Sequence, residues 1–249
     1  MRSILFAKRN TKEILRDPIN LFFGLGFPLI LLALLSFINK RLPHDANNSM
    51  FEITRLASGI SAFAPVFMSL FSGMLLSKDR SSSFLMRLFA SPMTAVDFIL
   101  GYSLPMLVFT VAQAAITFLA ACIIGLEFSA NILLAIAVNI PVAVLFVGIG
   151  LLCGCLLNEK AVGGICGALL TNVSGWLSGT WIPLDLIGGT FKKIAEALPF
   201  YRAVQATYAA LTGDFSAILN HLAVVFGYMI VLYALAVIIF NHKMSSDNV

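Results

Sequence analysis

The sequence contains four cysteines, whose spacing shows whether they could bind a metal or form a redox pair. Cys122, Cys153, Cys155 and Cys166 all fall inside long apolar runs. Cys153 and Cys155 are two residues apart, so on a helix their thiols point to different sides. Thiols buried in such runs behave as small hydrophobic groups. The pattern therefore indicates packing, and neither a metal site nor a redox pair is expected.

Motifs for nucleotide, metal or acyl-transfer chemistry are missing from the sequence. A P-loop needs G-x-x-x-x-G-K-[ST] to hold phosphates, and no glycine of this chain is followed by lysine. The H-E-x-x-H and G-x-S-x-G patterns are also missing. We therefore assign no catalytic, cofactor-binding or metal-ligating residue, and an ATP-dependent step would need a separate polypeptide.

The composition is that of an integral membrane protein. Hydrophobic residues make up 59% of the 249 residues, charged residues only 11%, and the mean hydropathy is +0.95. So much apolar surface cannot be buried in a soluble core. A helix needs about 20 mainly apolar residues to cross a bilayer, and the sequence predicts an all-α protein with six spans. They cover residues 21–38, 56–77, 99–124, 132–157, 161–178 and 217–240.

The positions of lysine and arginine predict the orientation. With the N-terminus inside, ten of the 16 fall on the cytoplasmic side, five of them ahead of the first span. The positive-inside rule then places both termini in the cytoplasm. From residue 56 onward, the predicted spans contain no Asp, Glu, Lys or Arg, although ion-driven carriers generally place such residues within the bilayer. Energy for uphill transport would therefore have to enter outside the spans.

Residues 1–18 carry the pattern of an amphipathic helix lying along the inner membrane surface. Ile4, Thr11, Ile14 and Leu15 fall along one side of it, and Pro18 is expected to end it. The alternative is a positively charged tail that only fixes the topology.

Residues 78–98 form a second cytoplasmic segment, in which a short amphipathic helix is predicted over 83–90. A two-turn helix without a partner is unstable, so we expect something to dock on its apolar residues. The alternative is that it lies against its own membrane domain or lipid headgroups. Thr94 and Asp97 then form a capping box for the third span. The apolar residues are Phe84, Leu85, Leu88 and Phe89.

Small residues form a stripe along the predicted fifth span. Such a stripe allows another backbone to approach closely, either from a second chain in a dimer or from a neighbouring span of the same chain. Asn172 and Trp176 lie on another face, which we expect to turn toward a cavity, although Trp176 also suits an interfacial anchor. The stripe consists of Gly163, Gly167, Thr171, Gly175 and Gly179.

Residues 179–216 connect the last two spans and include an amphipathic half-helix at the outer surface. Phe191 begins its apolar face, Gly188 and Gly189 precede it, and Pro199 follows it. Backbone that leaves a helix near a membrane must face water or be covered by protein, which suits a lid over an exit pathway. The alternative is an interfacial helix that only anchors the last span.

Three stretches, in this order and spacing, resemble the permease subunits of type-two ABC exporters. They are "RDPINLFFGLGFPLILL", "KDRSSSFLMRLFASPMTAVDFILGY" and "SGTWIPLDLIGGTFKKIAEALPFYRAVQA". The resemblance covers nearly the whole chain and implies a single transmembrane domain over residues 1–249. The second stretch departs from the family, whose members commonly carry a Gly-Thr pair and an acidic residue where this chain has Ser82, Ser83 and Met86.

The resemblance implies a multi-pass permease of a bacterial plasma membrane that exports a drug-like, peptide or lipid-like amphipathic molecule. ATP and Mg²⁺ would be bound by a separate ATP-binding-cassette subunit, a second permease copy or paralogue would complete the pathway, and no nucleic acid would be involved. Residues 179–216 would include short extracellular helices that re-enter the outer leaflet. Expected contacts of the ATPase are Phe84, Leu85, Arg87, Leu88 and Phe89; expected pathway residues are Phe67, Phe71, Asn172 and Trp176; and expected lid residues are Gly188, Gly189, Phe191 and Pro199.

Two other classes of function remain open from the sequence. The chain could be a non-transporting membrane anchor or sensor that recruits a cytoplasmic protein through residues 78–98. It could also be a secondary carrier that couples to an ion through backbone carbonyls. Copurification with an ATPase, together with substrate-stimulated hydrolysis, separates the exporter from both.

Overall fold

The computed structural model describes residues 2–41, 52–82, 84, 94–182 and 184–246, and the elements in this part of the chain are all helical. An all-α fold was predicted, because the sequence offers long apolar runs separated by short polar segments. The helices are α1 (Arg2–Arg16), α2 (Pro18–Leu21), η1 (Phe22–Gly26), α3 (Phe27–Arg41), α4 (Ile53–Phe63), α5 (Val66–Ser81), α7 (Ala95–Ile124), α8 (Asn131–Leu156), α9 (Glu159–Val162), η3 (Gly163–Leu169), α10 (Leu170–Leu177), α11 (Leu184–Ile187), α12 (Gly189–Ala197), α13 (Pro199–Thr212) and α14 (Phe215–Ser246).

Among the described residues, five helical stretches are long and apolar enough to cross a membrane. The predicted fifth span, 161–178, is helical over α9, η3 and α10 but is not one of these five. The structure thus supports a multi-pass membrane protein, and the count of six spans stays a prediction. The five stretches are Pro18–Arg41, Ile53–Ser81, Val96–Ile124, Asn131–Leu156 and Phe215–Ile239.

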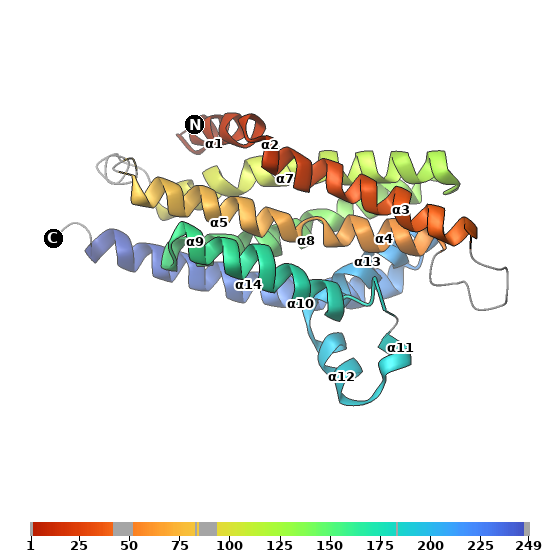
Figure 1. The fold of residues 1–249 in the computed structure, drawn as a ribbon. Helices are drawn as coiled ribbons and strands as arrows, with labels where there is room; N and C mark the ends of the chain where they lie inside the picture. The colour runs from red at the N-terminus through yellow and green to blue at the C-terminus, as the bar shows by residue number, and fades with distance from the viewer. Residues whose placement is uncertain (1, 42–51, 83, 85–93, 183, 247–249) are drawn as a thin grey trace.

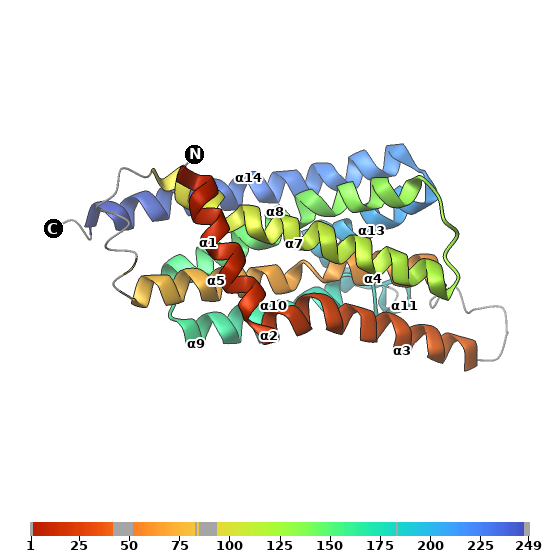
Figure 2. The same cartoon turned by 90° about the horizontal axis from the view of Figure 1, so that it is seen from above.

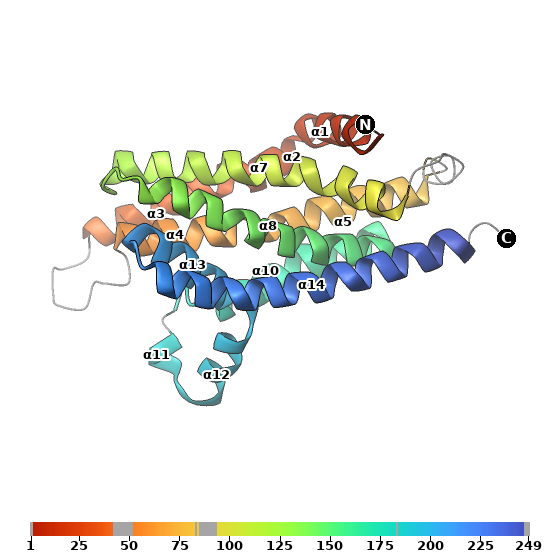
Figure 3. The same ribbon diagram turned by 180° about the vertical axis from the view of Figure 1, so that it is seen from behind.

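The long helices lie roughly parallel in one elongated bundle (Figure 1). The start of α1 and the end of α14 lie toward the same end of the bundle, which we call the terminal end; the other is the opposite end. Figure 3 shows α14 running along the bundle beside α8. The short helices α11 and α12 project sideways from the bundle, below α10 in Figure 1.

Local signals explain where two helices begin. The predicted capping box is confirmed: Thr94 accepts from the backbone N–H of Asp97, whose carboxylate accepts from the backbone N–H of Thr94. Near the N-terminus, α1 ends at Arg16 and Pro18 is the first residue of α2, where its missing N–H costs nothing. Asp17 caps α2 by accepting from two backbone N–H groups.

Helices α5 and α8 pack backbone against backbone through glycines. A methyl group added to Gly73 would lie 2.8 Å from the Gly150 carbonyl oxygen, and one added to Gly154 would lie 2.7 Å from the Gly73 carbonyl oxygen. At Gly150 an added methyl would overlap the carbonyl oxygen of Ser69. Gly150 and Gly154 form a G-x-x-x-G pair, the pattern that brings membrane helices close together. This close backbone contact between α5 and α8 therefore involves glycines outside the small-residue stripe that the sequence analysis identified.

We expect Gly150→Ala to destabilise the bundle by about 1–3 kcal/mol, the usual cost of overpacking, because backbone cannot yield as a side chain can. The measurement is thermal unfolding of the purified protein in detergent. Gly163→Ala is the matched control, since a methyl group there meets nothing within 4 Å. Equal melting temperatures for the two variants would contradict the close packing of α5 on α8.

Candidate functional site

Helix α1 lies across the terminal end of the bundle, at a steep angle to the long helices beneath it (Figure 2). Its buried face consists of Phe6, Ala7, Asn10 and Ile14. The predicted amphipathic helix is therefore present, and its position along the membrane surface stays a prediction. Of the residues assigned to that side, Ile14 is buried, whereas Ile4 and Leu15 are exposed.

A buried ion pair fixes α1 to the bundle. The guanidinium of Arg9 holds the carboxylate of Asp79 with two contacts, 2.5 Å from Nη1 to Oδ2 and 2.8 Å from Nη2 to Oδ1. The hydroxyl of Tyr102 donates to the same Oδ2 at 2.9 Å. The Asp79 side chain is only 4% exposed. A carboxylate so buried is tolerated only when it is paired and hydrogen-bonded, so Arg9 and Tyr102 together make this position possible.

The same face of α1 also contacts α7. The side-chain amide of Asn10, which is fully buried, donates to the Gly101 carbonyl at 3.0 Å. A side chain at Gly101 would overlap the ring of Phe6, so the glycine permits this approach. The Phe6 ring in turn packs edge-on against Tyr102, with 4.9 Å between ring centroids. We call this set of contacts, made by Phe6, Arg9, Asn10, Asp79, Gly101 and Tyr102, the α1 clamp.

Helix α1 touches both sides of the segment 85–93. On one side, the Arg9 guanidinium lies 4.4 Å from the centre of the Phe84 ring, which also stacks on Phe6. On the other side, the Ser3 hydroxyl donates to Asp97 at 3.1 Å. Of the predicted ATPase contacts, Phe84 is thus held by α1. The other predicted contacts, which lie outside the described residues, are Leu85, Arg87, Leu88 and Phe89. Most of the helix expected over 83–90 also lies outside the described residues.

The four predicted pathway residues do not share one cavity lining. Phe67 and Phe71 are buried in the aromatic core of the bundle, where Phe67 lies against Phe63 and Phe27. Asn172 and Trp176 lie on the exposed face of α10. The amide of Asn172 donates to the backbone carbonyl four residues earlier.

The small-residue stripe is interrupted by a π-helical segment, η3. Spacing by four keeps residues on one face only in a continuous α-helix. Gly163 faces open space, a methyl group on Gly167 would meet Leu70 at 3.4 Å, and one on Gly175 would lie 3.0 Å from Nε1 of Trp181. Thr171, which bonds to the carbonyl of Cys166, and Gly179, with φ +72°, complete the predicted set. Its members therefore have different neighbours.

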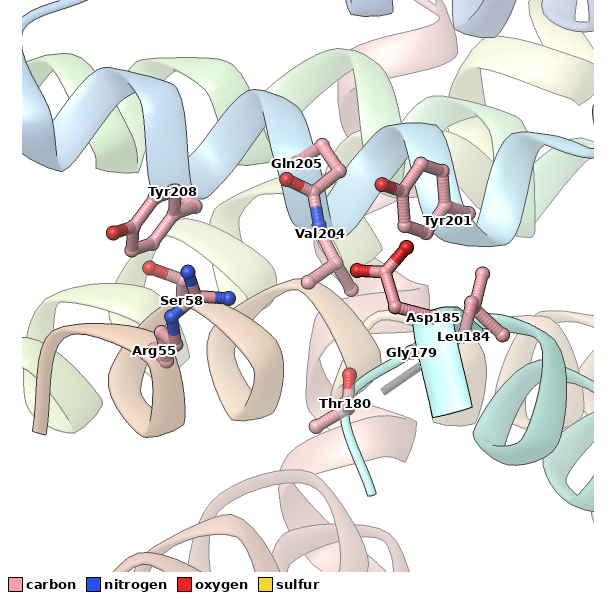
Figure 4. Close-up of a pocket in the computed structure, with 10 residues that line it drawn as sticks. All are labelled: Arg55, Ser58, Gly179, Thr180, Leu184, Asp185, Tyr201, Val204, Gln205 and Tyr208. Carbon is pink, nitrogen blue, oxygen red and sulfur yellow. The ribbon is translucent and has the colours of Figure 1, made fainter. Parts of the chain in front are cut away.

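A cavity of about 240 Å³ lies toward the opposite end, between α4, α13 and the segment that leads into α11 (Figure 4). Arg55 stands at one side of it, with its guanidinium 4.9 Å from the centre of the Tyr208 ring, and Asp185 stands at the other. Lys192 of α12 donates to Asp185 at 2.6 Å, and this hydrogen bond lowers the pKa of Asp185 below its ordinary value. The cavity therefore presents polar groups and charges of both signs.

The predicted lid residues lie at the two ends of α12. Gly188 and Gly189 have φ of +63° and +58°, positive values that glycine adopts readily and that allow the sharp turn from α11 into α12. Phe191 is partly buried in α12, and buried Pro199 begins α13. The predicted half-helix is thus present as α12.

Sequence reasoning missed Asp79 and Tyr102. Residues 56–77 were taken as a span free of charge, but the same helix continues to Ser81 and stays buried at Asp79. Arg9 was one of the five cations counted ahead of the first span, and no partner was predicted for it. The available signal was a lone acid, between Lys78 and Arg80, directly after an apolar run.

Comparison with known proteins adds one finding. The family model described as ABC-2 type transporter matches residues 3–212. No curated protein matches the chain.

We expect Arg9→Gln to lower the stability of the protein by roughly 3 kcal/mol, because it leaves a buried carboxylate without its counter-charge. Lys12→Gln, which removes an exposed cation of the same helix, should change stability little. The double variant Arg9→Gln/Asp79→Asn should recover much of the loss, since no uncompensated charge remains. Thermal unfolding in detergent measures all three; a double variant no more stable than Arg9→Gln would contradict the ion-pair account.

Proposed function

Because the chain belongs to the ABC-2 type transporter family, the permease components of ABC transporters, we propose that it is an exporter permease driven from its terminal end. Family membership implies a separate ATP-binding subunit, consistent with a sequence that lacks a P-loop. In this proposal the terminal end is cytoplasmic, the ATPase docks on residues 78–98, and an amphipathic drug-like, peptide or lipid-like molecule moves outward through a plasma membrane.

The observation that carries the proposal is the α1 clamp. Helix α1 is bound to the end of α5 through Asp79 and to the start of α7 through Gly101. It also contacts Phe84 before the segment 85–93 and Asp97 after it. A force applied to this segment would therefore reach α5 and α7 together, because α1 joins both sides of it. This is the mechanical property that a joint for a separate motor subunit requires.

The distribution of charge favours an ATP-driven permease over an ion-coupled carrier. In the five long apolar stretches of the described chain, Asp, Glu, Lys and Arg lie near the ends. Asp79 is the most deeply buried of these charges, and Arg9 and Tyr102 already satisfy it. An ion-coupled carrier generally keeps its titratable groups in the pathway.

A second permease chain is part of the proposal. On α10, η3 and their neighbours an apolar face is left uncovered, with Trp176 62% exposed and Leu169 59% exposed. The open surface at Gly163 and Gly164 lies on the same helix. A homodimer or heterodimer that covers this face would enclose Asn172 and Trp176, the exposed half of the predicted pathway set.

We expect Leu88→Asp to uncouple ATP hydrolysis from transport, because a charge placed in an apolar docking contact costs several kcal/mol. The measurement is copurification with the ATPase and substrate-stimulated hydrolysis in proteoliposomes. Phe128→Asp, at an exposed apolar residue of the opposite end, is the matched control and should couple normally. Normal coupling in Leu88→Asp would mean that the ATPase docks on another part of the chain. An associated ATPase whose hydrolysis is never stimulated by substrate would favour the membrane anchor or sensor.

The segment 179–216 acts in this proposal as a hinged cover over the exit. We expect the double variant Gly188→Ala/Gly189→Ala to slow export severalfold, since an alanine at each of these positive φ angles costs about 1–3 kcal/mol, while substrate binding from the terminal end persists. Gly164→Ala, at an open helical glycine, is the control. Transport and binding are measured on the same reconstituted sample. Unchanged transport in a normally inserted double variant would contradict the cover and favour an interfacial helix that only anchors the last span.

A further inference from the structure

A second cavity, of about 330 Å³, lies at the terminal end between the α1–α2 junction, α5 and α9. Its size falls in the range of about 300–1,000 Å³ typical of ligand sites. Both apolar and charged residues line it. We call the apolar residues, which include Phe71, Met74 and Leu75, the floor, and the charged residues the rim: Glu13, Arg16, Asp17, Lys78 and Glu159.

The five charged side chains of the rim are not neutralised by one another. Within the described part of the chain, none of them takes part in an ion pair. Asp17 is engaged in capping α2, which leaves two cations and two acids facing a shared opening. An occupant that carries both a negative and a positive group would satisfy both kinds of side chain, whereas a singly charged one would satisfy only half of them.

The rim lies where the apolar stretches end. Asp17 directly precedes the stretch Pro18–Arg41, Lys78 is in the last turn of Ile53–Ser81, and Glu159 follows shortly after Asn131–Leu156. We therefore expect these positions to lie at the level of the lipid headgroups and the apolar floor to lie at the start of the acyl chains.

We propose that this cavity binds a phospholipid whose headgroup combines a phosphate with a primary ammonium, as in phosphatidylethanolamine. The phosphate would accept from Arg16 and Lys78, and the ammonium would donate to Glu13 and Glu159. A choline headgroup has no N–H to donate, and a glycerol headgroup brings no positive charge to the acids. The lipid would join the α1–α2 junction to α5 and α9, a role that does not depend on ATP-driven export.

The test is native mass spectrometry of the full chain, released from nanodiscs that contain equal amounts of phosphatidylethanolamine, phosphatidylcholine and phosphatidylglycerol. We expect retained lipid to be enriched in phosphatidylethanolamine. Lys78→Gln should weaken retention of all three lipids about tenfold, and Glu159→Gln should reduce the preference for phosphatidylethanolamine over phosphatidylglycerol about tenfold. Lys12→Gln, an equal charge change on the exposed face of α1, should alter neither.

Retention without headgroup preference would overturn the proposal, as would equal losses in Lys78→Gln and Lys12→Gln. Each variant is first required to unfold at the temperature of the unaltered protein. If Lys78→Gln fails this requirement, Arg16→Gln carries the same test. Soluble glycerophosphoethanolamine is added in a separate arm: competition by this compound supports headgroup recognition, whereas displacement of the lipid by glycerophosphocholine to the same extent contradicts it.

Discussion

A carboxylate buried at the end of a membrane helix cannot remain unpaired, and the arrangement of the terminal end depends on this constraint. Asp79 is almost without solvent contact, so Arg9 must lie against it and α1 must cross the bundle at that point. Once α1 is there, Phe6 needs the open space above Gly101, and Asn10 needs a backbone acceptor that α7 provides. The contacts of α1 with both sides of the segment 85–93 are made from the position in which this ion pair holds the helix.

The next residue along α5 extends the connection to the other side of the bundle. Arg80 donates to the carbonyls of Cys155 and Leu157, at the C-terminus of α8, where the last carbonyls lack helical partners and a cation is favoured. The last turn of α5 is therefore bonded to α1 and α7 through Asp79 and to α8 through Arg80. Farther along, the glycines shared by α5 and α8 bring the two backbones into close contact. We infer that α5 and α8 move as one unit.

The sequence was sufficient wherever a local signal determines the outcome. Long apolar runs predicted the helices, Thr94 and Asp97 predicted a cap, and two glycines marked the start of the half-helix that is α12. The sequence was insufficient where the outcome depends on a residue of another helix that lies far away along the chain. The periodicity of residues 1–18 predicts a helix, but a fully buried Asn10 depends on a carbonyl of α7 that no local pattern reveals. Small residues recur in both α8 and the predicted fifth span, and only packing distinguishes the glycines that touch backbone from those that face open space.

The same contrast in packing indicates where movement should be sought. Where α5 meets α8, helices are in backbone contact, and such interfaces tolerate little displacement. The run formed by α9, η3 and α10 has open glycines, large exposed apolar side chains and a π-helical segment, in which hydrogen bonds depart from the regular α-helical ladder. Elements that change position are drawn from the less stable parts of a structure. If the α1 clamp transmits force into the rigid pair, we expect the displacement to appear between that pair and the α9–α10 run, the side on which a second chain is proposed to bind.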